Sequence, residues 1–337
     1  MPTSIEPELR QLRDQLGGSP IDPVFAGLHH IRYMVAPGAA VPFIHEWGKK
    51  TRYHFAGAFR RTADQSIQYV LRLEDNPIAM IVEESNSLPQ GFPRLRSLGF
   101  RVHDLAPVRR VLQEEKIHFL ERDHAVVTAP LTGLGDSFSY VTREEMDWFT
   151  SPEYTDYEPE NSDMLMLRNV DHHLLDVQGI DHIAYRTRLE EVRMAARRLM
   201  RLTAYRFDSC YTVDGQNAET MVFRWGHEKP AMVASYGWNE ESVVHNYVAR
   251  YGPRVHHLAF YVNKVLALVE HQQKSGIEFT TQEMIGDASR GILQIFTTPS
   301  PHSHEICEYI ERFGGFRGFF DKGNVAELMG STEKFNQ

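Results

Sequence analysis

Four short apolar segments of this sequence resemble one another, and this repetition constrains the fold more than any other feature. They occupy residues 27–35, 97–102, 179–187 and 254–262, and each has the pattern of a buried strand. Helical patterns follow most of them, and further short apolar runs come after the helices. Four strand–helix–strand–strand–strand (βαβββ) modules therefore predict an α+β chain.

The modules fall into two pairs. An acidic stretch punctuated by proline lies between the second and third modules, as expected for a linker. We therefore predict two tandem domains, each with one curved, open-barrel sheet. The predicted division is an N-terminal extension with a helix (1–25), a first domain (26–150), a linker (151–177), a second domain (178–320) and a C-terminal tail (321–337).

Composition excludes several classes of protein. The 337 residues carry 36 basic and 45 acidic side chains, a formal charge of −9, so nucleic acid and anionic membranes are not expected partners. No apolar run is long enough to span a bilayer, and no secretion signal opens the sequence. Two cysteines make a disulfide framework implausible, which favours a cytoplasmic protein. A homo-oligomer is compatible with the sequence.

Three residues of the second domain are candidate metal ligands. His182 and His257 occupy the same place in the first strands of the third and fourth modules. The alternation of residues 306–310 places Glu308 on a face with isoleucines, where a lone carboxylate needs a partner. Two imidazoles and one carboxylate form the facial triad typical of non-haem Fe(II) oxygenases, although zinc accepts the same ligands.

Residues next to the candidate ligands, and those at matching places in the first domain, are not expected to bind metal. Strand alternation points His256 away from the face of His257, so we expect His256→Ala to leave metal binding intact. Alignment of the repeats puts His30, Ser97 and Ser139 opposite the three candidate ligands. The first domain is therefore expected to bind no metal and to serve in packing. Residues 277–280 are predicted to form the second strand of the fourth module.

The second half of the sequence resembles the 4-hydroxyphenylpyruvate dioxygenase-like family of the vicinal oxygen chelate (glyoxalase-like) superfamily. The resemblance lies in residues 180–183, 255–259, 293–297 and 308–312, and in the ending at residues 314–316 and 323–324. A weaker likeness at residues 132–137 extends it over most of the chain.

The resemblance implies a catalytic function. The family binds Fe(II) through two histidines and a glutamate, which correspond to His182, His257 and Glu308. Its substrate is a small 2-oxo acid, such as 4-hydroxyphenylpyruvate, which is oxidatively decarboxylated by dioxygen and hydroxylated in the same molecule. The substrate and dioxygen are therefore the implied partners.

The resemblance also implies a substrate site. The residues that correspond to it are Gln294, Phe296, Asn239, Phe316, Asn324, Val325 and Met329. The last two stand where the family has phenylalanines that flank the substrate's ring. Because Val325 and Met329 form a looser apolar wall, a substrate other than 4-hydroxyphenylpyruvate stays open.

Two other functions remain open on the same fold. An extradiol catechol dioxygenase shares the ligand set and a short interval before the glutamate, but the C-terminal tail argues against it. A non-catalytic protein that binds a small molecule would show no dependence on metal.

Overall fold

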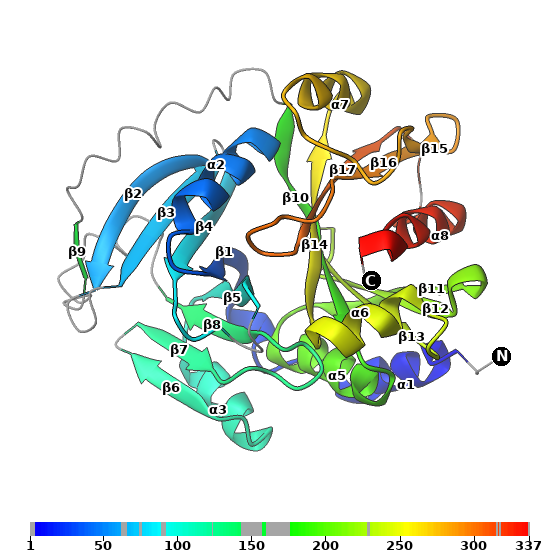
Figure 1. Cartoon of the computed structure of the whole chain (residues 1–337). Coiled ribbons are helices and arrows are strands. Elements are labelled where there is room, and N and C mark those ends of the chain that lie inside the picture. Colours follow the sequence, from blue (N-terminus) through cyan, green and yellow to red (C-terminus); the bar gives the residue numbers. More distant parts are fainter. Residues whose placement is uncertain are drawn as a thin grey trace.

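Two curved sheets, one from each half of the chain, form the body of the computed structural model (Figure 1). Both sheets are built from modules in which a strand and a helix precede three more strands, which confirms the predicted α+β fold. The structure describes residues 4–61, 66–73, 76–88, 92–122, 124–142, 157–159, 176–227, 230–314, 316 and 318–335.

The first sheet contains two modules and one added strand. Its order is β6-β7-β8-β5-β1-β4-β3-β2-β9, with the first strands of the two modules, β1 and β5, antiparallel at its centre. The short β9 comes from the predicted linker, most of which lies outside the described residues. The elements are β1 (Phe25–Val35), α2 (Ala40–Lys50), β2 (His54–Arg61), β3 (Ile67–Leu73), β4 (Asn76–Glu84), β5 (Arg94–Val102), α3 (Ala106–Glu114), β6 (Phe119–Arg122), β7 (Ala125–Thr128), β8 (Ser137–Val141) and β9 (Tyr157–Pro159).

The second sheet repeats this plan in the order β11-β12-β13-β10-β14-β17-β16-β15. The predicted strand at residues 277–280 is wrong, because only Phe279 pairs there, in an isolated bridge with Thr297. The short β15 takes that place in the module. The elements are β10 (Val177–Thr187), α5 (Val192–Leu202), β11 (Arg206–Val213), β12 (Ala218–Arg224), β13 (Ala231–Gly237), β14 (Arg254–Val262), α7 (Val265–Lys274), β15 (Ile285–Asp287), β16 (Ile292–Phe296) and β17 (Ile306–Arg312).

Three further helices pack against the second domain: α1 (Glu6–Leu16), α6 (Val243–Tyr251) and α8 (Lys322–Ser331). Helix α1 precedes the first domain in sequence but contacts α5 and β11 (Figure 1). The side chains of Ser242 and Asp321 cap the first turns of α6 and α8 by accepting backbone N–H bonds. These caps fix where both helices begin beside the second sheet.

A shared core joins the two domains. One cluster of buried side chains includes Trp47 and Phe100 of the first domain as well as Tyr185, Phe260 and Tyr309 of the second. At its edge, buried ion pairs join Arg94 to Asp136 and Arg254 to Glu305, and Glu305 also accepts the backbone N–H of Leu95. The other face of the second sheet packs against α6 and α8, and α8 lines the pocket described below. Within the described ranges, no helix has the length and apolar character needed to cross a membrane.

Candidate metal centre

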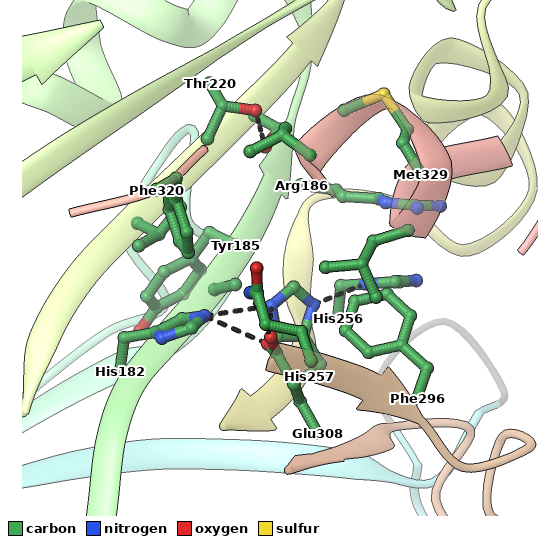
Figure 2. A pocket seen from close by; sticks show the side chains of 16 residues that line it. His182, Tyr185, Arg186, Thr220, His256, His257, Phe296, Glu308, Phe320 and Met329 are labelled. Atoms are coloured by element: carbon green, nitrogen blue, oxygen red, sulfur yellow. Dashed lines mark hydrogen bonds and ion pairs between the residues drawn. The ribbon is translucent and has the colours of Figure 1, made fainter. Parts of the chain in front are cut away.

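Adjacent strands bring the three predicted ligands together on the inner face of the second sheet. On β10, β14 and β17, the pairing sets His182 beside Ala259 and Ala259 beside Glu308. His257 lies two residues earlier on β14 and faces the same space. Nε2 of His182 is 3.3 Å from Nε2 of His257, and Oε2 of Glu308 lies 3.2 and 3.3 Å from these two atoms (Figure 2).

The geometry of this triangle fits a metal ion. Donor atoms about 2.1 Å from an ion are separated by about 3.0 Å at neighbouring octahedral corners and by about 3.4 Å in a tetrahedron. The Oε2 atom of Glu308 is buried and makes no hydrogen bond within the described residues. These three side chains are also the one group there whose His, Cys, Asp and Glu ligand atoms gather closely enough to hold an ion. The donor set therefore suits a divalent cation on one triangular face.

A buried carboxylate holds the first histidine in position. Nδ1 of His182 lies 3.0 Å from Oδ1 of Asp181, which also accepts a 2.9 Å bond from Arg312. Burial alone would raise the pKa of Asp181, but the bonds from His182 and Arg312 outweigh it and hold that pKa well below its usual range. Asp181 therefore stays ionised and accepts the Nδ1 proton of His182, which leaves Nε2 free as a ligand.

The second histidine is held by its own neighbour. Nδ1 of His257 lies 2.8 Å from Nδ1 of His256, and the His256 ring packs edge-on against Tyr247. Burial is the main reason that the pKa values of both histidines lie well below the usual value, so both are neutral. With Nε2 of His257 as the ligand atom, the Nδ1 of His257 carries the proton and donates a hydrogen bond to Nδ1 of His256.

The prediction that His256 points away is therefore wrong, and two β-bulges explain why. In the pairing of β10 with β14, Ala184 faces His257 and Tyr185 faces Val255, so His256 is an extra residue on its strand. Asp181 is the extra residue between Ile180 and His182 on the other strand. A bulge changes the direction of its side chain, so strict alternation fails at both positions.

The glutamate is positioned by the C-terminal tail. Gln294 on β16 donates a 2.7 Å bond from Nε2 to Oε1 of Glu308, and its own Oε1 accepts a 3.1 Å bond from Asn324 of α8. All three side chains are buried. Asn324 therefore acts two hydrogen bonds away from Glu308, by fixing the amide of Gln294.

A pocket opens beside the three ligands, and its volume together with the open entrance is about 470 Å³. Of the predicted substrate residues, Gln294, Phe296, Val325 and Met329 line it. The Phe296 ring lies 4.8 Å from that of His257. Further lining residues include Ala184, Tyr185, Arg186, Thr220, Val233, Ser235, His256, Phe320 and Leu328.

Three predicted substrate residues do not line this pocket: Asn324, which bonds to Gln294 instead, and two that lie away from it. Asn239 is an exposed turn residue whose Oδ1 accepts the backbone N–H of Glu241. Phe316 packs instead beside Ala259, Ile292 and Ile310. Both residues were predicted from the family resemblance, and the structure places them outside the pocket.

Phe320, which was not predicted, lines the pocket where Phe316 does not. Its ring lies 5.1 Å from that of His182, and the Phe319 ring lies 5.6 Å away. Arg312 fixes this segment by donating a 2.5 Å bond to the carbonyl of Phe319 and by stacking on its ring. The adjacent aromatic pair at 319–320 was the available sequence signal.

Asp181, Arg186, His256 and Arg312 were also missed as site residues. Asp181 stands directly before a predicted ligand, and second-ring partners of metal-bound histidines are often carboxylates, so its position was a usable signal. Arg186 and Arg312 stand at strand positions that no sequence pattern singles out.

The first domain has the corresponding register with different side chains. His30 pairs with Gly99, and Gly99 pairs with Ser139, as His182, Ala259 and Glu308 do in the second domain. The His30 ring lies over Gly99, where an added Cβ would come within 1.9 Å of it. Ser97 aligns with His257 in the same scheme, so hydroxyls replace two of the three ligands.

Comparisons with known proteins address the fold. No protein-family profile matches the sequence, and a comparison with curated proteins gives no match. Among solved structures, a triple mutant of 4-hydroxymandelate synthase from Streptomyces coelicolor aligns with a TM-score of 0.68 at 15% identity, over 93% of this chain and all of that one.

Two further structures are similar. A fusion of a xylose isomerase-like TIM barrel with 4-hydroxyphenylpyruvate dioxygenase aligns with a TM-score of 0.65 at 16% identity, over 98% of this chain and 57% of the fusion. BphC, a halotolerant catechol dioxygenase, aligns with a TM-score of 0.54 at 10% identity, over 86% of this chain and 87% of that one. This chain therefore shares its overall fold with all three structures.

Proposed function

We propose that the protein is an Fe(II)-dependent dioxygenase that acts on a small 2-oxo acid, with His182, His257 and Glu308 as the metal ligands. The observation that carries the proposal is the convergence of two Nε2 atoms and one carboxylate oxygen within 3.2–3.3 Å of one another at the end of a pocket. The names of the similar structures, which include a 4-hydroxyphenylpyruvate dioxygenase, support the reaction class.

The bound ion would orient the 2-oxo acid and make dioxygen reactive toward it. His182, His257 and Glu308 would hold the ion, and the pocket beside them would admit these two molecules. The substrate would lose its carboxyl carbon as CO₂, with one atom of dioxygen entering the new carboxylate and the other a hydroxyl group. 4-Hydroxyphenylpyruvate is the first substrate to test.

The residues around the ligands have separate roles in this proposal. Asp181 and His256 hold the protons on the Nδ1 atoms of the two histidines, so that both Nε2 atoms stay available. Gln294 keeps one carboxylate oxygen of Glu308 occupied, which directs the other toward the ion. Phe296 and Phe320 cover the site with apolar surface and exclude water from the reacting atoms.

Two alternatives rest on the same fold. The likeness to a catechol dioxygenase supports extradiol ring cleavage, which uses the same kinds of ligand. A non-catalytic protein that binds a small molecule is the second alternative, and it predicts no consumption of dioxygen. Residence in the cytoplasm, suggested by the two cysteines, and a homo-oligomeric state are further parts of the proposal.

Oxygen uptake tests the function. Protein reconstituted with Fe(II) without air is mixed with 4-hydroxyphenylpyruvate in aerated buffer, and dioxygen and CO₂ are measured. We expect equal amounts of dioxygen consumed and CO₂ released, no uptake by iron-free protein and loss of uptake in His257→Ala. The control His271→Ala, at a half-buried position on α7 that does not line the pocket, should show normal uptake. Uptake with catechols but with no 2-oxo acid would overturn the proposal in favour of ring cleavage.

A further inference from the structure

Arg186 presents a buried positive charge to the pocket without an acidic partner. It stands near the end of β10, is 4% exposed and lines the pocket between Met329 and Phe296 (Figure 2). Its Nη2 donates a 3.0 Å bond to the hydroxyl of Thr332, and its guanidinium stacks on Tyr247 at 4.7 Å. Its Nη1 is buried and has no hydrogen-bond partner in the described part of the chain.

The other buried arginines of the described chain are paired with acids. Arg94 bonds to Asp136, and Arg254 bonds to Glu305. Burial lowers the pKa of Arg186 to about 10, so its guanidinium remains charged at neutral pH. A buried cation without a counter-ion is costly, and a protein keeps one where a ligand supplies the anion.

The position of Arg186 suits one end of an elongated ligand. It lies four residues beyond His182 on the same strand, and at a rise of about 3.3 Å per residue their Cα atoms are about 13 Å apart. The pocket lining also includes the apolar side chains of Phe296, Val325, Leu328 and Met329. The pocket thus combines a candidate metal centre, apolar walls and a buried cation.

We propose that the preferred substrate is a 2-oxo acid with a second carboxylate at its far end, and that Arg186 binds this carboxylate. The inference rests on the proposed function, since the 2-oxo acid group is taken to bind at His182, His257 and Glu308. Nη1 of Arg186 is the atom left to donate to the carboxylate, because Nη2 already donates to Thr332. A monocarboxylate of the same length leaves this buried charge unpaired.

A purely structural role for Arg186 predicts a different result. Thr332 follows α8, and its hydroxyl also donates to the carbonyl of Met329, so Arg186 ties this tail to β10. If Arg186 only made this link, its loss would lower the stability of the fold and the affinity for every ligand equally. It would not change the selectivity between two ligands that differ only in the far carboxylate.

Binding to protein loaded with Fe(II) without air separates these roles. The probes are 2-oxoadipate, which has a second carboxylate, and 2-oxohexanoate, which has the same chain length without it. Titration calorimetry on the full chain should show that the unaltered protein binds the diacid roughly 10- to 100-fold more tightly than the monoacid. The same pair is repeated with one carbon fewer and one more, because the spacing between the candidate metal centre and Arg186 sets the best fit.

Variants assign the preference to one side chain. Arg186→Gln should bind both ligands with similar affinity, Arg186→Lys should retain part of the preference, and Arg188→Gln, an exposed control, should behave as the unaltered protein does. The comparison of the two ligands on the unaltered protein needs no variant, so a misfolded variant does not remove the test.

The outcomes separate the two proposals. Equal affinity for diacid and monoacid across the series in the unaltered protein, or a preference that survives in Arg186→Gln, overturns the inference while the proposed function stands. Failure of every 2-oxo acid to bind the iron-loaded protein, or failure of iron itself to bind, overturns both.

Discussion

Replacement of His256 by phenylalanine tests how the second ligand histidine is oriented. The change removes the Nδ1 atom that lies 2.8 Å from Nδ1 of His257 and keeps a ring to pack against Tyr247 and Phe296. Without metal, the His257 proton can move to Nε2 and donate to Glu308, which lies 3.3 Å away. With metal, Nε2 is occupied and Nδ1–H is left buried without an acceptor.

The expected cost therefore falls mainly on the metal-bound state. A buried donor left without a partner costs about 1–3 kcal/mol. At about 1.4 kcal/mol for each tenfold change, the dissociation constant for a divalent ion should rise roughly 5- to 150-fold. Loss of an outer partner of a metal-bound histidine has effects of about 10- to 100-fold in other sites, which agrees with this range.

Anaerobic titration with Fe(II), followed by metal analysis, measures the change, and two variants control it. His29→Phe removes an Nδ1 atom that lies 3.0 Å from Nδ1 of His30 in the first domain, a similar contact between two histidines, and should leave metal affinity unchanged. His256→Asn offers an amide oxygen as acceptor and should restore most of the affinity. Unchanged affinity in His256→Phe would refute the role given to His256.

Three further predictions concern Asp181, the partner of His182, and the first domain. Asp181→Asn should weaken metal binding about 10- to 100-fold by calorimetry, because the ligand histidine beside it loses a charged acceptor; equal affinity would contradict this. Gly99→Ala should lower the free energy of unfolding by about 1–3 kcal/mol in urea, since the new Cβ meets the His30 ring, whereas Gly215→Ala, which meets nothing within 4 Å, should not. Burial lowers the pKa of His29 to about 4, so as pH falls from about 6.5 toward 4 the unfolded chain takes up the proton first and stability falls by on the order of 3 kcal/mol; His29→Asn should flatten this part of the stability curve, and an unchanged curve would refute it.

The fold was predictable because its signal is repeated four times. Similar strands at regular places, each followed by the same order of elements, imply the same module wherever they recur. The register between modules follows too, and the alignment of His30 with His182 agrees with the pairing of both central strands. The second strand of the fourth module was misplaced because an apolar run at residues 277–280 forms only an isolated bridge.

The site was predictable only where strands are regular. Alternation on β17 correctly gives the face of Glu308, but it fails at Asp181 and His256, where the strands bulge. The positions of the aromatic side chains after β17 could not be predicted, because a hydrogen bond from Arg312 to the carbonyl of Phe319 holds this segment. Such contacts depend on tertiary structure and leave no periodic pattern in the sequence.

The most direct test of the account is to locate the iron. A crystal of the protein grown without air in the presence of Fe(II) and measured at the iron absorption edge should show one anomalous peak per chain, within about 2.2 Å of Nε2 of His182, Nε2 of His257 and Oε2 of Glu308. A peak bound by other side chains, or no peak at this triangle from protein that carries one iron per chain in solution, would contradict the assignment of the metal centre.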